Sequence, residues 1–147
     1  MRIFDFVTTI DSCILASDFL YRGTRMPNWN IYAAVAHLRD NAEAGSTANC
    51  AKYVRRAIEA GGITLTHTAS ARNYGGPLTA AGFHEVLSGA PWKGDVVVIQ
   101  PITGHPDGHM AMYDGQIWIS DFKQYHGFYP SQAYRNIHPP YKIYRRN

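Results

Sequence analysis

The sequence predicts an α+β protein in which helices from the first half of the chain pack on a small antiparallel sheet from the second half. Apolar residues recur at helical spacing as far as Ala60, whereas the β-branched run Val96–Ile99 indicates a buried strand. Further on, Asp114-Gly115 separates two strand-like segments, as in a hairpin. With 147 residues, 46% hydrophobic and 17% charged, the chain is expected to form one domain, 1–147. Residues 1–29 form an arm to which we assign no role.

Two helices are expected before residue 62. Asn30 is a suitable N-cap for a helix from Ile31 to about Ala44, where Gly45 ends it. The second helix is expected over residues 50–60, with Gly61-Gly62 as its end. Cys50 would therefore lie in the first turn of an amphipathic helix.

A third short helix is expected after a loop rich in Thr, Ser and Gly over residues 64–76. Thr79 would cap this helix, and Phe83, Val86 and Leu87 would lie on its buried side.

The rest of the chain is expected to form strands. Residues 95–100 should be buried on both faces, and residues 109–113 and 116–122 should form the two arms of the hairpin. Residues 141–144 are expected to form a last strand at an edge of the sheet.

Composition and charge exclude several classes of protein. The net charge of +3 is not gathered into the basic patches of nucleic-acid binders. No apolar run approaches the roughly 18 residues that a membrane helix needs. Asp5 and Asp11 interrupt any apolar segment of signal-peptide length, so we expect synthesis in the cytoplasm without a signal peptide. Cys13, in the arm, is expected to be a free thiol.

Cys50 is the first candidate catalytic residue. At a helix N-terminus, free backbone N–H groups and the helix dipole favour the thiolate and offer part of an oxyanion hole. A lone cysteine on the apolar face of a helix is also common as simple packing, and position alone leaves both readings open.

His109 and Asp121 strengthen the catalytic interpretation. Across a hairpin that turns at Asp114-Gly115, His109 would face residue 120 or 121 on the neighbouring strand. His109 could then take a proton from Cys50 while Asp121 orients the imidazole, which is the arrangement of a catalytic triad.

A metal site is the alternative for part of this segment. His105, Asp107 and His109 are ligand types that zinc accepts. However, Pro106 and Gly108 prevent the helix that would bring both imidazoles to one face. We therefore predict no metal and no cofactor.

Several segments resemble the papain-like cell-wall hydrolases, the NlpC-type and CHAP amidases. They are Asn49-Cys50-Ala51, residues 93–98, residues 108–115 and residues 118–122. The segment from Tyr74 to Phe83, with the small size, is most similar to the amidase effectors of type VI secretion.

The resemblance implies a papain-like fold and a cysteine amidase that cuts peptidoglycan stem peptides, chiefly between D-glutamate and meso-diaminopimelate, or at the cross-link. By matched position, Cys50 would be the nucleophile, His109 the base and Asp121 the third member, a place where many relatives carry His, Asn or Gln. Tyr32 would match an oxyanion tyrosine, and Asn49 and Tyr74 would lie beside the substrate.

The resemblance also implies delivery by a specialised secretion system, action in the periplasm of a target bacterium, and a periplasmic immunity protein that plugs the cleft. Three alternatives stay open. The chain could be a phage endolysin with the same chemistry, a toxin that deamidates or transglutaminates protein glutamine, or a binding module in which Cys50 only packs.

Overall fold

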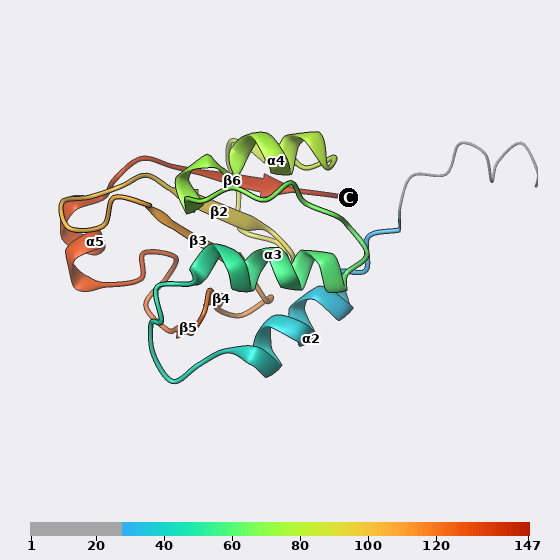
Figure 1. Ribbon diagram of the computed structural model, residues 1–147, viewed down its shortest axis with the longest axis horizontal. Helices are drawn as coiled ribbons and strands as arrows, with labels where there is room; N and C mark the ends of the chain where they lie inside the picture. Colours follow the sequence, from blue (N-terminus) through green and yellow to red (C-terminus); the bar gives the residue numbers. More distant parts are fainter. Residues whose placement is uncertain (1–27) are drawn as a thin grey trace, which may run out of the picture.

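The computed structural model describes residues 28–147, so the expectations for the arm before Asn28, Cys13 included, lie outside the described residues. The described chain is an α+β fold with one six-stranded antiparallel sheet, which confirms the predicted class (Figure 1). The elements, in chain order, are α2 (Ile31–Asn41), α3 (Cys50–Ala60), the 3-10 helix η1 (Ala71–Asn73), α4 (Gly75–Ala80), β1 (His84–Val86), β2 (Val96–Ile99), β3 (His109–Tyr113), β4 (Trp118–Ile119), β5 (Lys123–Gln124), α5 (Gln132–Ile137) and β6 (Tyr141–Arg145).

The first two expected helices are present. The Asn30 side chain accepts a hydrogen bond from the Ala33 N–H and so caps α2, as predicted. The helix ends at Asn41, three residues before the predicted Ala44. It ends there because the Glu43 N–H donates to the backbone oxygen of Asp121 at 2.7 Å, which draws the chain onto the sheet. Helix α3 runs from Cys50 to Ala60 with Gly61 as its C-cap, as expected.

The sheet has the strand order β1-β6-β2-β3-β4-β5. All four residues of β2 are buried, which confirms the strand predicted to be covered on both faces. The last strand, β6, was expected at an edge, and this is wrong. It pairs with β2 on one side and with β1 on the other, so the edges are β1 and β5.

The third helix is displaced from its predicted position. Helix α4 ends at Ala80, so Thr79 lies in its last turn and its hydroxyl donates to the Gly75 carbonyl. Gly82, with a φ of +94°, turns the chain into β1. Phe83 is buried as expected, but Val86 is in a strand and Leu87 is 87% exposed. The spacing of apolar residues in so short a run does not distinguish a helix from an edge strand. Pairing with β6 makes residues 84–86 a strand.

The hairpin is present with a different register. Asp114 closes a wider turn, because its carboxylate accepts the backbone N–H groups of Gln116 and Ile117. Met112 consequently pairs with Ile119 and Tyr113 with Trp118, one residue beyond the expected alignment, and β4 is only two residues long. Because β4 ends at Ile119, its pairing with β3 stops before it reaches His109.

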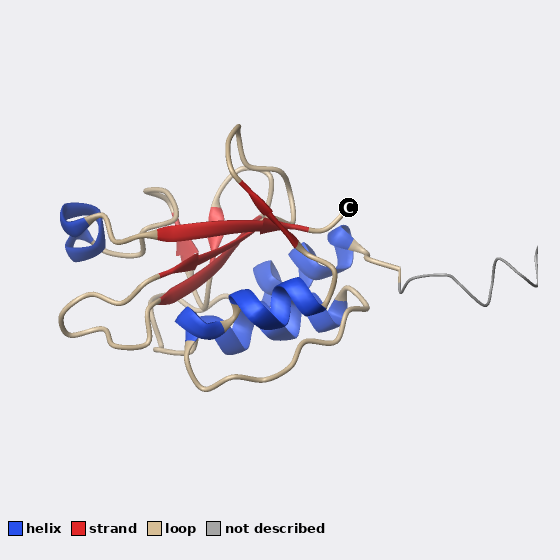
Figure 2. Ribbon diagram, turned by 90° about the horizontal axis from the view of Figure 1, so that it is seen from above, coloured by secondary structure: helices blue, strands red, loops and turns tan. Residues whose placement is uncertain are grey.

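Two apolar clusters cover the sheet. Helices α2, α3 and α4 pack against one face around Val54, Ile58 and Met110 (Figure 2). On the other face, Val97, Ile99 and Tyr134 form a smaller cluster with α5. Within residues 28–147 no helix is long and apolar enough to cross a membrane. Cys50 is packed at the margin of the first cluster, where α3 meets β3.

Candidate active site

Cys50 is the first residue of α3 and lies over β3. The backbone N–H groups of Met110, Ala51 and Cys50 itself are placed to hydrogen-bond to its thiolate form, which acts to lower its pKa. Two residues earlier, Ala48 has a φ of 62°, in the left-handed region that costs a residue with a side chain about 1 kcal/mol. The turn before the nucleophile position is therefore strained, and the strain is held by contacts on either side.

His109 begins β3, and its side chain is buried. Its Nε2 lies 2.7 Å from Oε1 of Gln124 in β5. The amide nitrogen of Gln124 donates to the carbonyls of Gly127 and Phe128, so its oxygen must face the imidazole. An oxygen can only accept here, so Nε2 carries the hydrogen and Nδ1 holds the free lone pair.

Asp121 was expected to orient His109, and the structure corrects this. The Asp121 side chain is fully buried. Its Oδ2 accepts the Thr47 backbone N–H at 2.6 Å, the Thr47 hydroxyl at 2.8 Å and the Asn49 N–H at 3.3 Å, while Oδ1 accepts the Ser120 hydroxyl. Asp121 therefore holds the strained turn before α3. Its effect on His109 is that of its negative charge, without a hydrogen bond between the two side chains.

Asp121 remains charged in this position. Burial alone would raise the pKa of its carboxyl, but hydrogen bonds from Thr47 and Asn49 bring the pKa below its usual value. Its negative charge acts to raise the pKa of both Cys50 and His109.

Burial dominates the ionisation of the Cys50 and His109 pair. It raises the pKa of the Cys50 thiol to about 11, and the backbone hydrogen bonds only partly oppose this. Burial lowers the pKa of His109 to about 4, although the hydrogen bond with Gln124 and the charge of Asp121 both act to raise it. The expected thiolate-favouring effect of the helix N-terminus is thus outweighed by desolvation. At neutral pH the pair is a thiol and a neutral imidazole.

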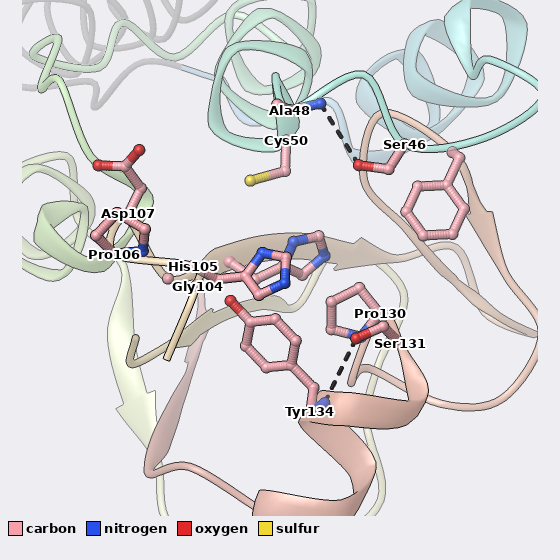
Figure 3. A pocket seen from close by; sticks show the side chains of 13 residues that line it. Ser46, Ala48, Cys50, Gly104, His105, Pro106, Asp107, Pro130, Ser131 and Tyr134 are labelled. Carbon is pink, nitrogen blue, oxygen red and sulfur yellow. Dashed lines mark hydrogen bonds between the residues drawn. The ribbon is translucent and has the colours of Figure 1, made fainter. Parts of the chain in front are cut away.

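A pocket of about 340 Å³ opens beside Cys50, toward α5 and residues 104–109. The Cys50 sulfur and the Tyr134 hydroxyl point into it from opposite sides (Figure 3). The Tyr134 ring lies 5.5 Å from that of His105 and 6.1 Å from that of His109. Burial, with the nearby Cys50, raises the pKa of Tyr134 to about 12, so its hydroxyl stays a donor at neutral pH.

A second pocket of about 390 Å³ lies on the other side of Cys50, between α3 and residues 67–74. The two pockets share Ala48, Cys50 and Asp107. Both volumes are within the usual range for small-ligand sites. The candidate nucleophile is therefore at the middle of a two-part cleft.

The three residues expected beside the substrate have different outcomes. Asn49 and Tyr74 line the second pocket, although Tyr74 is almost wholly buried. Tyr32 is 75% exposed, its ring centroid lies 4.8 Å from Nζ of Lys93, and it lines neither pocket at Cys50. The structure does not bring Tyr32 to the sulfur, which corrects its expected place in an oxyanion hole.

Sequence reasoning missed Gln124 and Tyr134. The strand β5 is too short to give a pattern, and α5 lies beyond the segments that carried the resemblance. The sequence offered one signal for α5, namely Ser131 as a possible helix N-cap. In the structure the Ser131 side chain does cap α5, by accepting a hydrogen bond from the Tyr134 N–H. Of the residues considered for a metal site, His109 is bonded to Gln124, and Asp107 accepts a hydrogen bond from the Ser70 hydroxyl at 2.6 Å.

Solved structures similar to the chain are complexes of a type VI effector with its immunity protein. One is the native Tae3-Tai3 complex from Ralstonia pickettii, with a TM-score of 0.79 and 57% identity over 81% of this chain and 100% of that chain. The selenomethionine form of the complex gives a TM-score of 0.74 and 60% identity over 76% of this chain and 98% of that chain. No protein-family model and no curated protein matches the sequence.

Proposed function

Because the chain belongs to the family of the type VI effector Tae3, we propose that it is an antibacterial effector that hydrolyses peptidoglycan stem peptides as a cysteine amidase. The single observation that carries the chemistry is that Cys50 and His109 line one cleft while Gln124 holds the imidazole by a hydrogen bond to Nε2. We assign the fold to the papain-like group on the same ground, a cysteine at a helix start over a strand that begins with the base.

The acylation step uses the neutral pair. His109 Nδ1 takes the proton of the Cys50 thiol as the sulfur attacks the amide carbonyl carbon, so that charge forms only during the attack. The oxyanion is held by the backbone N–H of Cys50, which has no acceptor within the helix, and by the Tyr134 hydroxyl across the pocket. The imidazolium then gives its proton to the leaving amine, which departs as the thioester forms.

Deacylation repeats the proton transfers with water. His109 takes a proton from a water molecule that attacks the thioester carbonyl, and the thiol is regenerated when the sulfur leaves and is protonated. Throughout, Gln124 holds the imidazole in one tautomer and one orientation. Asp121 holds the turn that carries the sulfur and favours the imidazolium by its charge.

The family membership favours the effector over the endolysin. We propose that the chain acts in the periplasm of a target cell, and that a cognate immunity protein protects the producer by covering the cleft at Cys50. The relatives with solved structures are effector–immunity complexes, which supports such a partner. For the scissile bond, the resemblance favours D-glutamyl–diaminopimelate, with the cross-link as the second possibility.

The test is mass spectrometry of purified Gram-negative muropeptides after incubation with the wild type or with Cys50→Ala. We expect new fragments from the wild type alone, whose masses identify the bond, and equal rates with and without a chelator. Cys50→Ala is a conservative change in volume and should keep the thermal stability of the wild type.

Three outcomes would contradict the proposal. Hydrolysis by Cys50→Ala at the wild-type rate would show that Cys50 is not the nucleophile. Loss of activity in chelator with recovery in zinc supports a metal enzyme. Intact muropeptides together with deamidation of a glutamine-containing protein support the glutamine-directed toxin.

A further inference from the structure

The cleft at Cys50 differs in charge between its two parts. Among residues 28–147, no lysine or arginine lines the pocket toward α5. The pocket between α3 and residues 67–74 is lined by Lys52 and Arg55, and also by Asp107. The Asp107 carboxylate already accepts from Ser70, so the second pocket has two cations and an acid that is hydrogen-bonded elsewhere.

The guanidinium of Arg55 has N–H donors beyond the one that binds Glu59. Its side chain is 17% exposed, and Nη1 donates to Glu59 at 2.9 Å. Its Nε is buried and has no hydrogen-bond partner within residues 28–147. A guanidinium binds a carboxylate through charge-assisted N–H donors, so Arg55 can bind an anion in the pocket that it lines.

The helix sets the distance from the reacting atoms. Lys52 and Arg55 are three residues apart and therefore neighbours on α3. Arg55 is five residues after Cys50, about 7.5 Å along the helix axis. About two residues of an extended peptide cover that length. A group bound by Arg55 would thus lie about two residues from the scissile amide.

We propose that the pocket between α3 and residues 67–74 is a carboxylate subsite, in which Arg55 and Lys52 bind a free carboxylate of the stem peptide. The inference rests on the proposed function. Stem peptides keep free carboxylates next to their amide bonds, because D-glutamate is linked through its side chain and diaminopimelate has a second carboxyl group. The subsite orients the substrate by placing its anionic part over α3 and the remainder toward α5.

The experiment compares two muropeptides that differ only in whether these carboxylates are free or amidated. For the wild type we expect kcat/KM to be about 10- to 100-fold higher on the free carboxylate, the range of a charge-assisted hydrogen bond. Arg55→Gln should reduce this preference to about threefold or less, because the free carboxylate loses its charged partner. Lys52→Gln should have a smaller effect in the same direction.

Two matched controls come from the same helix. Arg56 is exposed and lines neither pocket, so Arg56→Gln should behave as the wild type. Glu59→Gln breaks the ion pair of Arg55 but keeps the guanidinium, so it should preserve the preference. Arg56→Gln tests whether any loss of positive charge on α3 has the same effect. Glu59→Gln tests whether loss of the ion pair within the helix has the same effect.

The results distinguish the two proposals. Equal rates of the wild type on both substrates would overturn the subsite and leave the amidase function standing. The same would follow if Arg55→Gln slowed both substrates equally. Absence of hydrolysis of either muropeptide by the wild type would overturn the function and the subsite together.

Discussion

Nε2 of His109 lies 2.7 Å from Oε1 of Gln124, a residue from the short edge strand β5. The amide of Gln124 is itself fixed by two backbone carbonyls, so its orientation is determined. A neutral amide thus occupies the place where a carboxylate was expected. It can select the tautomer of His109, but it contributes no net charge to stabilise the imidazolium.

Replacing Gln124 should separate orientation from charge. We expect Gln124→Ala to lower kcat by about 100-fold, because a correctly placed general base contributes about 10²- to 10⁴-fold. Gln124→Glu should keep the orientation and raise the pKa of His109, since a carboxylate favours the imidazolium. The acid limb of its pH–rate profile should then move to higher pH. An unchanged kcat in Gln124→Ala would contradict the assigned role.

The pH dependence of the wild type should be broad. His109 accepts a proton only when neutral, and its pKa is about 4, so kcat/KM should be level from about pH 5 upward and fall as the pH drops through 4. Because the pKa of Cys50 is about 11, alkylation by iodoacetamide should rise about tenfold per pH unit between pH 6 and 9. Mass spectrometry of the labelled protein measures this. A rate of alkylation independent of pH over that range would indicate a preformed thiolate–imidazolium pair.

Tyr134→Phe tests the proposed donor across the pocket. The ring is buried among apolar residues, so the variant should keep its fold. Loss of one oxyanion donor costs about 10²- to 10³-fold in kcat. A peptide aldehyde that forms a hemithioacetal with Cys50 should lose affinity by a similar factor, while KM changes little. Tyr129→Phe, on a tyrosine that donates to the Pro139 carbonyl, is the matched control. Equal aldehyde affinity in Tyr134→Phe and the wild type would remove Tyr134 from the mechanism.

Asp121 should behave as a support of the turn before α3. Asp121→Asn keeps one acceptor for Thr47 and Asn49, so we expect partial activity and a loss of about 1 kcal/mol in the free energy of unfolding. Removing its charge should also lower the pKa of His109, which moves the acid limb to lower pH. Asp121→Ala leaves the donors of Thr47, Asn49 and Ser120 without their acceptor and should cost about 3 kcal/mol. Urea denaturation and the pH–rate profile measure both effects. Full activity and wild-type stability in Asp121→Ala would refute this role.

Asp95 is expected to matter for stability alone. Its fully buried carboxylate binds Arg145 through two hydrogen bonds of 2.8 Å and accepts the Trp92 N–H. Asp95→Ala leaves Arg145 with no carboxylate partner there and should cost about 3 kcal/mol, or about 10 °C in Tm. The control Lys142→Gln breaks the exposed pair with Glu85 and should shift Tm by less than about 2 °C. Calorimetry that finds equal shifts for the two variants would contradict this account.

The sequence by itself determined the α+β class, the start of α3 at Cys50 and the buried strand β2. Each of these follows from local signals, namely an N-terminal turn followed by helical periodicity, a pair of glycines after Ala60, and a β-branched run. His109 was likewise recognised by its position at the start of a strand. Such signals lie within a few residues of the element they define.

Tertiary structure decided which side chain bonds to His109, the ionisation of Cys50 and His109, and the order of the strands. Strand β4 ends at Ile119, so its pairing with β3 stops before it reaches His109. The next strand, β5, then brings Gln124 to the imidazole, while Asp121 bonds to Thr47 and Asn49. Desolvation depends on packing from α2, α3 and the sheet together, which no local pattern records. The central position of β6 and the placement of Tyr134 likewise depend on contacts between residues far apart in the chain.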